Sequence, residues 1–129
     1  MSAYEALPHD ITFVAAVDMT NAQYQFVKVV ANESSNTPQV ALCIEPTDQA
    51  IGVVQNCPPL GGAAQVRVYG VSFVTLGATL AAPALVGPGT SGAAIAVVAA
   101  TDWAAGTLLT GGNQGELGSV LLQHIGLGQ

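Results

Sequence analysis

Glycine and proline interrupt the longest uncharged part of this chain so often that no long helix is expected there. The segment Val68–Thr101 contains no Asp, Glu, Lys or Arg, which could suggest a membrane span. Breaking residues occur throughout it, namely Gly70, Gly77, Pro83, Gly87, Pro88, Gly89 and Gly92. Each remaining apolar piece is far shorter than the roughly 20 residues that a membrane helix needs. The pattern therefore favours short strands and argues against a membrane-spanning helix.

Alternating side chains predict strands inside and outside this region. The clearest is 65–69 (QVRVY), where two valines alternate with a glutamine, an arginine and a tyrosine. After Gly70 the apolar phase moves to Val71 and Phe73, which predicts a bulge or sharp bend within one long strand. Other strands are expected from β-branched and aromatic residues at 11–17, 23–30, 39–44, 50–55 and 117–125.

The turn signals between these segments indicate the fold class. Polar or Pro/Gly-rich turns are expected at 32–38 (NESSNTP) and 56–62 (NCPPLGG), whereas 93–106 is compatible with a strand or a short buried helix. The sequence thus predicts an all-β fold with at most one short helix, a small β-barrel or β-sandwich-like domain. Residues 1–10 are expected to form a flexible N-terminal arm, and 11–129 one β-rich domain.

Charge is unusually sparse. Only 8% of the residues are charged, against about 25% in a typical domain. The net charge is −6, and Lys28 and Arg67 are the only basic residues besides the histidines. Nucleic-acid binding is not expected, because it needs several cations to neutralise phosphates. Half of the residues are hydrophobic, which favours a surface that is hidden against other copies or against a partner.

Residues that could bind a metal are few and widely spaced. His9 and His124 lie at opposite ends of the chain, and Cys43 and Cys57 form no CxxC pair, so no metal site is expected. The segment MSAYEALPHD has neither the basic nor the apolar region of a secretory signal. The two cysteines are therefore predicted to be buried free thiols.

Candidate catalytic groups have simpler structural interpretations. Asp102 beside Trp103 is the best acid–base candidate, but we expect Asp102 to cap a short helical turn and Trp103 to pack in a core or interface. His124 has no acid nearby in the sequence and is interpreted as an interface histidine. The GPGTSG segment at 87–92 matches GxGxxG but lacks the strand–turn–helix context of a nucleotide site, so it is predicted to be a flexible turn. Neither an enzyme nor a cofactor is expected.

One stretch of the chain carries a family resemblance. The segment IGVVQNCPPLGGAAQVRVYGVSFV resembles a recurring core of the capsid decoration (cement) proteins of tailed bacteriophages, in which a strand ending in I-G-V precedes a V-x-V-x-G-V strand. Downstream, TLAAPALVGPGTSGAAIAV and GELGSVLLQHIG are similar in outline to the Ala-rich segment and final strand of those proteins. The resemblance covers roughly residues 50–129. The Cys-Pro-Pro turn and a longer loop near Asn113 depart from it.

The resemblance implies a structural protein of the virion. Such a protein forms a homotrimer, is made in the host cytoplasm and binds the outside of an expanded capsid near its threefold positions, where it contacts the major capsid protein. The arm would order on the shell, which makes its first eight residues the candidate capsid contacts: Met1, Ser2, Ala3, Tyr4, Glu5, Ala6, Leu7 and Pro8. The candidate trimer contacts are Arg67, Tyr69, Trp103 and His124.

Three other functions remain open at this point. The first is another virion subunit, such as the base of a head fibre or a tail component. The second is a small β-barrel that binds an apolar ligand in a cavity lined by Phe73, Trp103 and valines. The third is an enzyme that uses Asp102, His124 or the cysteines.

Overall fold

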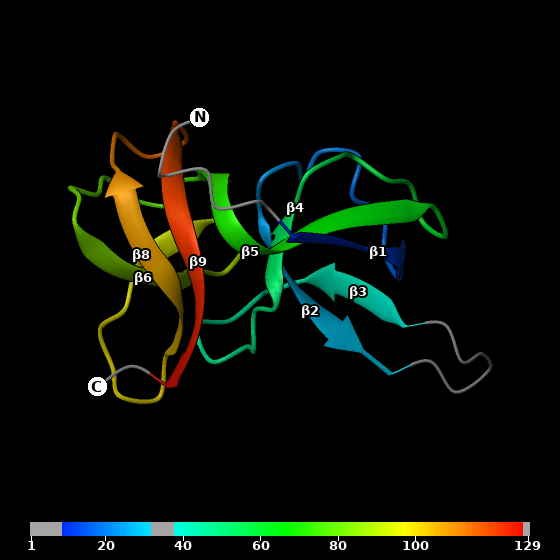
Figure 1. Cartoon of the computed structure of the whole chain (residues 1–129), viewed down its shortest axis with the longest axis horizontal. Helices are drawn as coiled ribbons and strands as arrows, with labels where there is room; N and C mark the ends of the chain where they lie inside the picture. The colour runs from blue at the N-terminus through cyan, green and yellow to red at the C-terminus, as the bar shows by residue number, and fades with distance from the viewer. Residues whose placement is uncertain (1–8, 32–37, 128–129) are drawn as a thin grey trace.

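The computed structural model describes residues 9–31 and 38–127, in which nine strands and no helix occur (Figure 1). The strands are β1 (His9–Ala15), β2 (Phe26–Val30), β3 (Gln39–Leu42), β4 (Gly52–Val54), β5 (Ala63–Thr75), β6 (Ala84–Pro88), β7 (Ala94–Ala96), β8 (Trp103–Thr110) and β9 (Leu117–Leu127). The predicted all-β class is confirmed. Of the two alternatives left open for 93–106, the strand is found and the short helix is not, because β7 and the start of β8 lie in this region with a turn between them. The described residues contain no helix that could cross a membrane.

The first five strands close into a barrel. Their order is β1-β3-β2-β4-β5, and β1 also pairs with β5, so the ring has no open edge between its first and last strands. The β1–β3 pairing is parallel, and the other pairings in the ring are antiparallel. The barrel interior is filled by buried side chains from all five strands and the β1–β2 connection, among them Phe13, Met19, Val27, Val40, Val54 and Val66.

A second sheet extends from the end of the barrel. It has the order β5-β9-β8-β6-β7 and is antiparallel throughout, and an isolated bridge joins Leu76, just after β5, to Ala94 in β7 (Figure 1). A second buried cluster fills the space between this sheet and the barrel, including Phe26, Val53, Val74, Leu108 and Val120. The two sheets therefore share packing as well as a strand.

The shared strand is β5, which passes from the barrel into the second sheet at Gly70. Gly70 has φ = 96°, a conformation that glycine adopts without steric cost, so the predicted bend at this position is confirmed. The predicted change of buried face is wrong. Burial continues on the even-numbered residues through Ser72 and Val74, whereas Val71 and Phe73 are 42% and 56% exposed.

β2 is shorter than the alternation at 23–30 predicts. Tyr24 has φ = 65°, which is uncommon for a residue other than glycine and ends the extended conformation before Phe26. Two backbone hydrogen bonds hold this turn: Tyr24 N donates to Val54 O at 2.8 Å, and Thr75 N donates to Tyr24 O at 2.8 Å. The turn thus joins the barrel strand β4 to the far end of β5.

β1 begins earlier than the sequence suggests. His9 and Asp10, which were expected in the arm, belong to β1 and pair with Tyr69 and Arg67 of β5. The rest of the predicted arm, including all eight candidate capsid contacts, lies outside the described residues.

Candidate functional site

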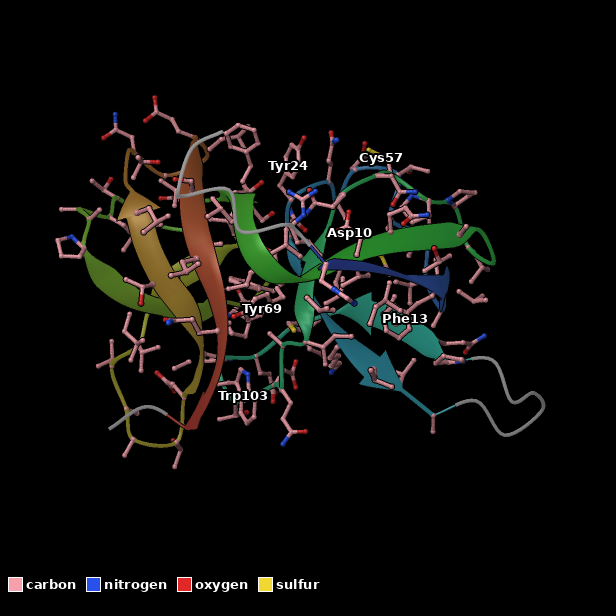
Figure 2. All side chains as sticks on the ribbon, viewed as in Figure 1. Asp10, Phe13, Tyr24, Cys57, Tyr69 and Trp103 are labelled. Carbon is pink, nitrogen blue, oxygen red and sulfur yellow. The ribbon has the colours of Figure 1, made fainter. Side chains whose placement is uncertain are left out.

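The chain's only arginine is bound within its own molecule. Arg67 Nε lies 2.9 Å from Asp10 Oδ1, and its two terminal nitrogens donate to Asp10 Oδ2 at 3.3 Å and to Val71 O at 3.1 Å (Figure 2). These contacts tie β1 to β5 beside the bend at Gly70. No local pattern predicts this ion pair, because its members are 57 residues apart in the sequence. A role of Arg67 in subunit contacts stays a prediction.

The chain's only lysine is also paired, and its partner closes a turn. Lys28 Nζ lies 3.1 Å from Asp48 Oδ2, and that oxygen also accepts hydrogen bonds from Ile44 N and Glu45 N at 2.8 and 3.1 Å. Burial alone raises the pKa of the Asp48 carboxyl, but the hydrogen bonds from Ile44, Lys28 and Glu45 outweigh it, so the pKa lies below the usual 3.8. Asp48 is therefore a charged structural acceptor at neutral pH.

A second turn repeats this hydrogen-bonding pattern. Asp102 Oδ2 accepts from Val98 N and Ala99 N at 3.2 and 3.1 Å, as Asp48 does in its own turn. Asp102 N also donates to Ala99 O at 3.0 Å, as Asp48 N donates to Glu45 O at 3.1 Å. The expected helix cap is corrected accordingly: Asp102 ends a turn that leads into β8, and its carboxylate is used for structure.

Trp103 connects the two turns. Its backbone N donates to Pro46 O at 2.8 Å and its indole Nε1 donates to Ala50 O at 3.1 Å, while the half-buried ring packs against the second cluster (Figure 2). Trp103 therefore packs in a core, one of its two expected roles. His124 lies in β9, within the strand predicted at 117–125, but its side chain lies outside the described residues.

The two cysteines are free, but only one is buried. Cys43 has no exposed surface, whereas Cys57 is exposed at the start of the Pro-Pro turn, which corrects the expectation that both are buried (Figure 2). The turn places Pro58 inside instead, where its carbonyl accepts a hydrogen bond from Met19 N at 2.9 Å. Burial raises the pKa of the Cys43 thiol to about 12, so this thiol is not ionised at neutral pH.

The cysteines should differ sharply in reactivity. We expect a maleimide or disulfide reagent at pH 8 to modify Cys57 completely while Cys43 stays unmodified, because only the exposed thiol can reach the reagent as a thiolate. Intact-mass spectrometry would count one modification in the native protein and two in denaturant. Fast modification of both thiols in the native state would contradict the burial of Cys43, and Cys57→Ser is the control that should show no native modification.

Two observations on the described residues concern metal and ligand binding. No group of three or more His, Cys, Asp or Glu side chains lies close enough among them to hold a metal ion. Two open surface hollows, of about 260 and 310 Å³, are lined by polar and apolar residues in similar measure, among them Gln25, Leu76, Asp48 and Ile51. Phe73 and Trp103 line neither hollow, and the Phe73 side chain points outward. The prediction that these two residues line a cavity for an apolar ligand is therefore wrong.

The GPGTSG segment is structural. Gly87 and Pro88 are buried in β6, and the remaining residues turn the chain into β7, with Gly92 at φ = 81°. Gly92 O accepts a hydrogen bond from Phe26 N at 2.7 Å, which ties this hairpin to the barrel. The segment was expected to be entirely a turn, but its first two residues belong to a strand.

The most distinctive exposed feature is a row of apolar side chains along β5, which we call the outer row: Tyr69, Val71 and Phe73. They are 58%, 42% and 56% exposed, and the Phe73 ring meets the Tyr24 ring edge-on with centroids 5.6 Å apart. Tyr24 and Tyr69 are labelled in Figure 2. Sequence reasoning identified Tyr69 but missed the other two. The pattern that could have identified them is the alternation at 65–69, in which the odd-numbered side chains are the more exposed ones. This alternation continues beyond Gly70 without interruption.

Comparisons with known proteins bear on the fold. The sequence matches no protein-family model and no curated protein sequence. The structure is similar to the crystal structure of the head fiber gp8.5 N base in bacteriophage phi29, with a TM-score of 0.73 and 14% sequence identity. The match covers 95% of this chain and 100% of that chain. At this identity the comparison establishes the fold: this chain has the same fold as a phage head fiber base over nearly its whole length.

Proposed function

We propose that this chain is a non-enzymatic structural protein of a phage virion, bound to the outside of the head. The observation that carries the proposal is the structural similarity to the phi29 head fiber base, which extends over 95% of this chain and 100% of that chain. The resemblance to phage decoration proteins is further support, because it rests on sequence motifs within residues 50–129 and not on the overall fold.

The chemistry of the described residues supports the same function. The carboxylate of Asp102, the acid–base candidate from the sequence, holds a turn, as that of Asp48 does, and both basic side chains are paired inside the molecule. What the described residues offer is a closed barrel with a second sheet packed on it and apolar side chains on the outside. Those properties suit a protein whose task is attachment.

Two forms of attachment agree with this proposal. The base of a head fibre is favoured by the fold similarity, and a cement protein is favoured by the sequence resemblance. In either form we propose a homotrimer at threefold or quasi-threefold positions, with the major capsid protein as partner. The two forms differ in effect, since a cement raises the resistance of the shell to heat and a fibre base need not.

Binding to isolated heads tests the proposal. We expect the purified protein to co-sediment with undecorated expanded heads of its phage until a fixed number of sites is filled, and electron microscopy to show the added density on the outer surface. Heads of an unrelated phage are the control and should bind none. Failure to co-sediment at micromolar protein would overturn the virion assignment.

The same complexes separate the two forms. A cement should raise the temperature at which filled heads release DNA or lose shape, compared with unfilled heads. An unchanged temperature with full occupancy would select the fibre base.

A further inference from the structure

Two members of the outer row, Val71 and Phe73, lie on one face of the second sheet, and Tyr69 continues the row on the barrel side of Gly70, where it pairs with His9 of β1. β5 pairs with β9 in a register that places Val71 opposite Leu121, Phe73 opposite Ser119 and Thr75 opposite Leu117. Directly paired residues of antiparallel strands project to the same side, so β9 extends the apolar surface sideways from β5. Leu117 is 50% exposed there, and Leu109 of neighbouring β8 is 45% exposed.

Several polar groups of this face are already hydrogen-bonded within the chain. Thr110 Oγ1 and Ser119 Oγ are 2.8 Å apart, and Thr107 Oγ1 donates to Gln123 Oε1 at 3.0 Å. At the start of the row, the Val71 carbonyl accepts a hydrogen bond from Arg67. When a surface is buried, the largest cost comes from polar groups that are left without a hydrogen-bond partner. These hydrogen-bonded groups keep their partners when the face is covered, so its burial removes apolar side chains from water without that cost.

Within the second sheet the strands of the face carry no formal charge from acidic or basic residues, and Arg67 and Asp10, which border the start of the row, are paired with each other. β8, β9 and the part of β5 after Gly70 contain no Asp, Glu, Lys or Arg. Elsewhere the chain has a net charge of −6, and its only two cationic side chains besides the histidines are paired internally. Two copies that meet elsewhere bring like charges together, whereas this face lets them approach without that cost.

We propose that the outer row, with Leu117, is the surface through which copies of this chain associate. Its exposed large side chains amount to on the order of 400 Å², within the range of the largest apolar patch on a monomer and about half of one side of a standard interface. The remainder would come from the hydroxyl and backbone surface around them. The inference rests on the oligomeric part of the proposed function and names its contact face, where Tyr69 is the sole member shared with the sequence-based candidates.

A charge placed on the face tests the inference. Phe73→Asp is expected to turn an assembled protein into a monomer, with at least a hundredfold weaker association, because a carboxylate would be buried without a partner. Leu117→Asp tests the same face from β9. Val98→Asp and Leu60→Asp are matched controls, since these side chains are 88% and 68% exposed outside this sheet, and both variants should assemble like the unmodified protein. Light scattering during size-exclusion chromatography over a range of concentrations gives the mass.

The outcomes that overturn the inference are distinct. The inference is overturned if the unmodified protein stays monomeric at high micromolar concentration. It is also overturned if Phe73→Asp and Leu117→Asp both still assemble, or if the two control variants dissociate to the same extent as the face variants. Thermal unfolding monitored by tryptophan fluorescence checks that each variant is folded. If Phe73→Asp does not fold, the mass of Leu117→Asp provides the test of the inference.

Head binding is measured separately on the same proteins. Monomeric variants that still bind heads, more weakly, support this inference together with the proposed function. Variants that assemble normally but no longer bind heads would assign the face to the capsid protein and overturn the inference. If the unmodified protein does not bind heads at all, the virion assignment is refuted, whereas the result on association between copies still stands.

Discussion

Gly87→Ala is expected to lower the free energy of unfolding by about 3 kcal/mol or more, although it adds a single methyl group. A Cβ at Gly87 would overlap the Trp103 carbonyl oxygen, a backbone atom that no rotamer change can move. Trp103 cannot retreat, because its backbone N and its indole are each hydrogen-bonded to the 44–50 segment. The methyl group would therefore force β6 away from the start of β8.

Gly61→Ala is the matched control for this effect. Gly61 has φ = 81°, and a Cβ there would meet nothing within 4 Å, so only the conformational cost of about 1 kcal/mol remains. Urea unfolding followed by the fluorescence of the single tryptophan gives both values. Equal losses in the two variants would show that the close approach at Gly87 is relaxed at little cost.

Phe26→Ala should be the most destabilising truncation of an aromatic side chain in the described structure. The Phe26 ring is fully buried in the cluster between barrel and second sheet, whereas the next residue, Val27, fills the barrel itself. Removal of a ring from such a site costs about 3–5 kcal/mol, a large part of the 5–15 kcal/mol that usually holds a domain together. The unfolding midpoint should fall by roughly 10 °C or more.

Phe73→Ala is the same chemical change on the exposed side of the molecule. Phe73 is 56% exposed and its main ring contact is with Tyr24, so the loss should stay below about 1.5 kcal/mol. Thermal unfolding monitored by circular dichroism would measure both variants at a concentration where association does not contribute. A Phe26→Ala loss no larger than that of Phe73→Ala would contradict the packing of the inter-sheet cluster.

The sequence predicted those strands whose two faces differ in polarity. β1, β5 and β9 were found because alternation or β-branched residues mark them within a few residues of their bounds. β8 was ambiguous because Ala, Gly and Leu fit a short helix as well as a buried strand. The shortening of β2 at Tyr24 depends on hydrogen bonds to Val54 and Thr75, and no local pattern contains that information.

The candidate surface was only partly predictable, for a related reason. The apolar character of Val71 and Phe73 suggested burial, but the core beneath β5 is filled by Val74 and its neighbours from other strands. The ion pair of Arg67 with Asp10 could not be predicted either, because the two residues are 57 positions apart in the sequence. Composition predicted that a charge-poor chain needs apolar contacts, but not which strand provides them.

The position of β5 in both sheets has a consequence for synthesis on the ribosome. All five barrel strands lie within residues 9–75, so the barrel can close while the chain that forms β6 to β9 is still being translated. The part of β5 after Gly70 then has an unpaired edge until β9 pairs with it, and β9 is the last of the described strands to be synthesised. A nascent chain at that stage exposes both a strand edge and the apolar surface around it, so slow translation or truncation before Leu117 should favour aggregation over release of a folded fragment.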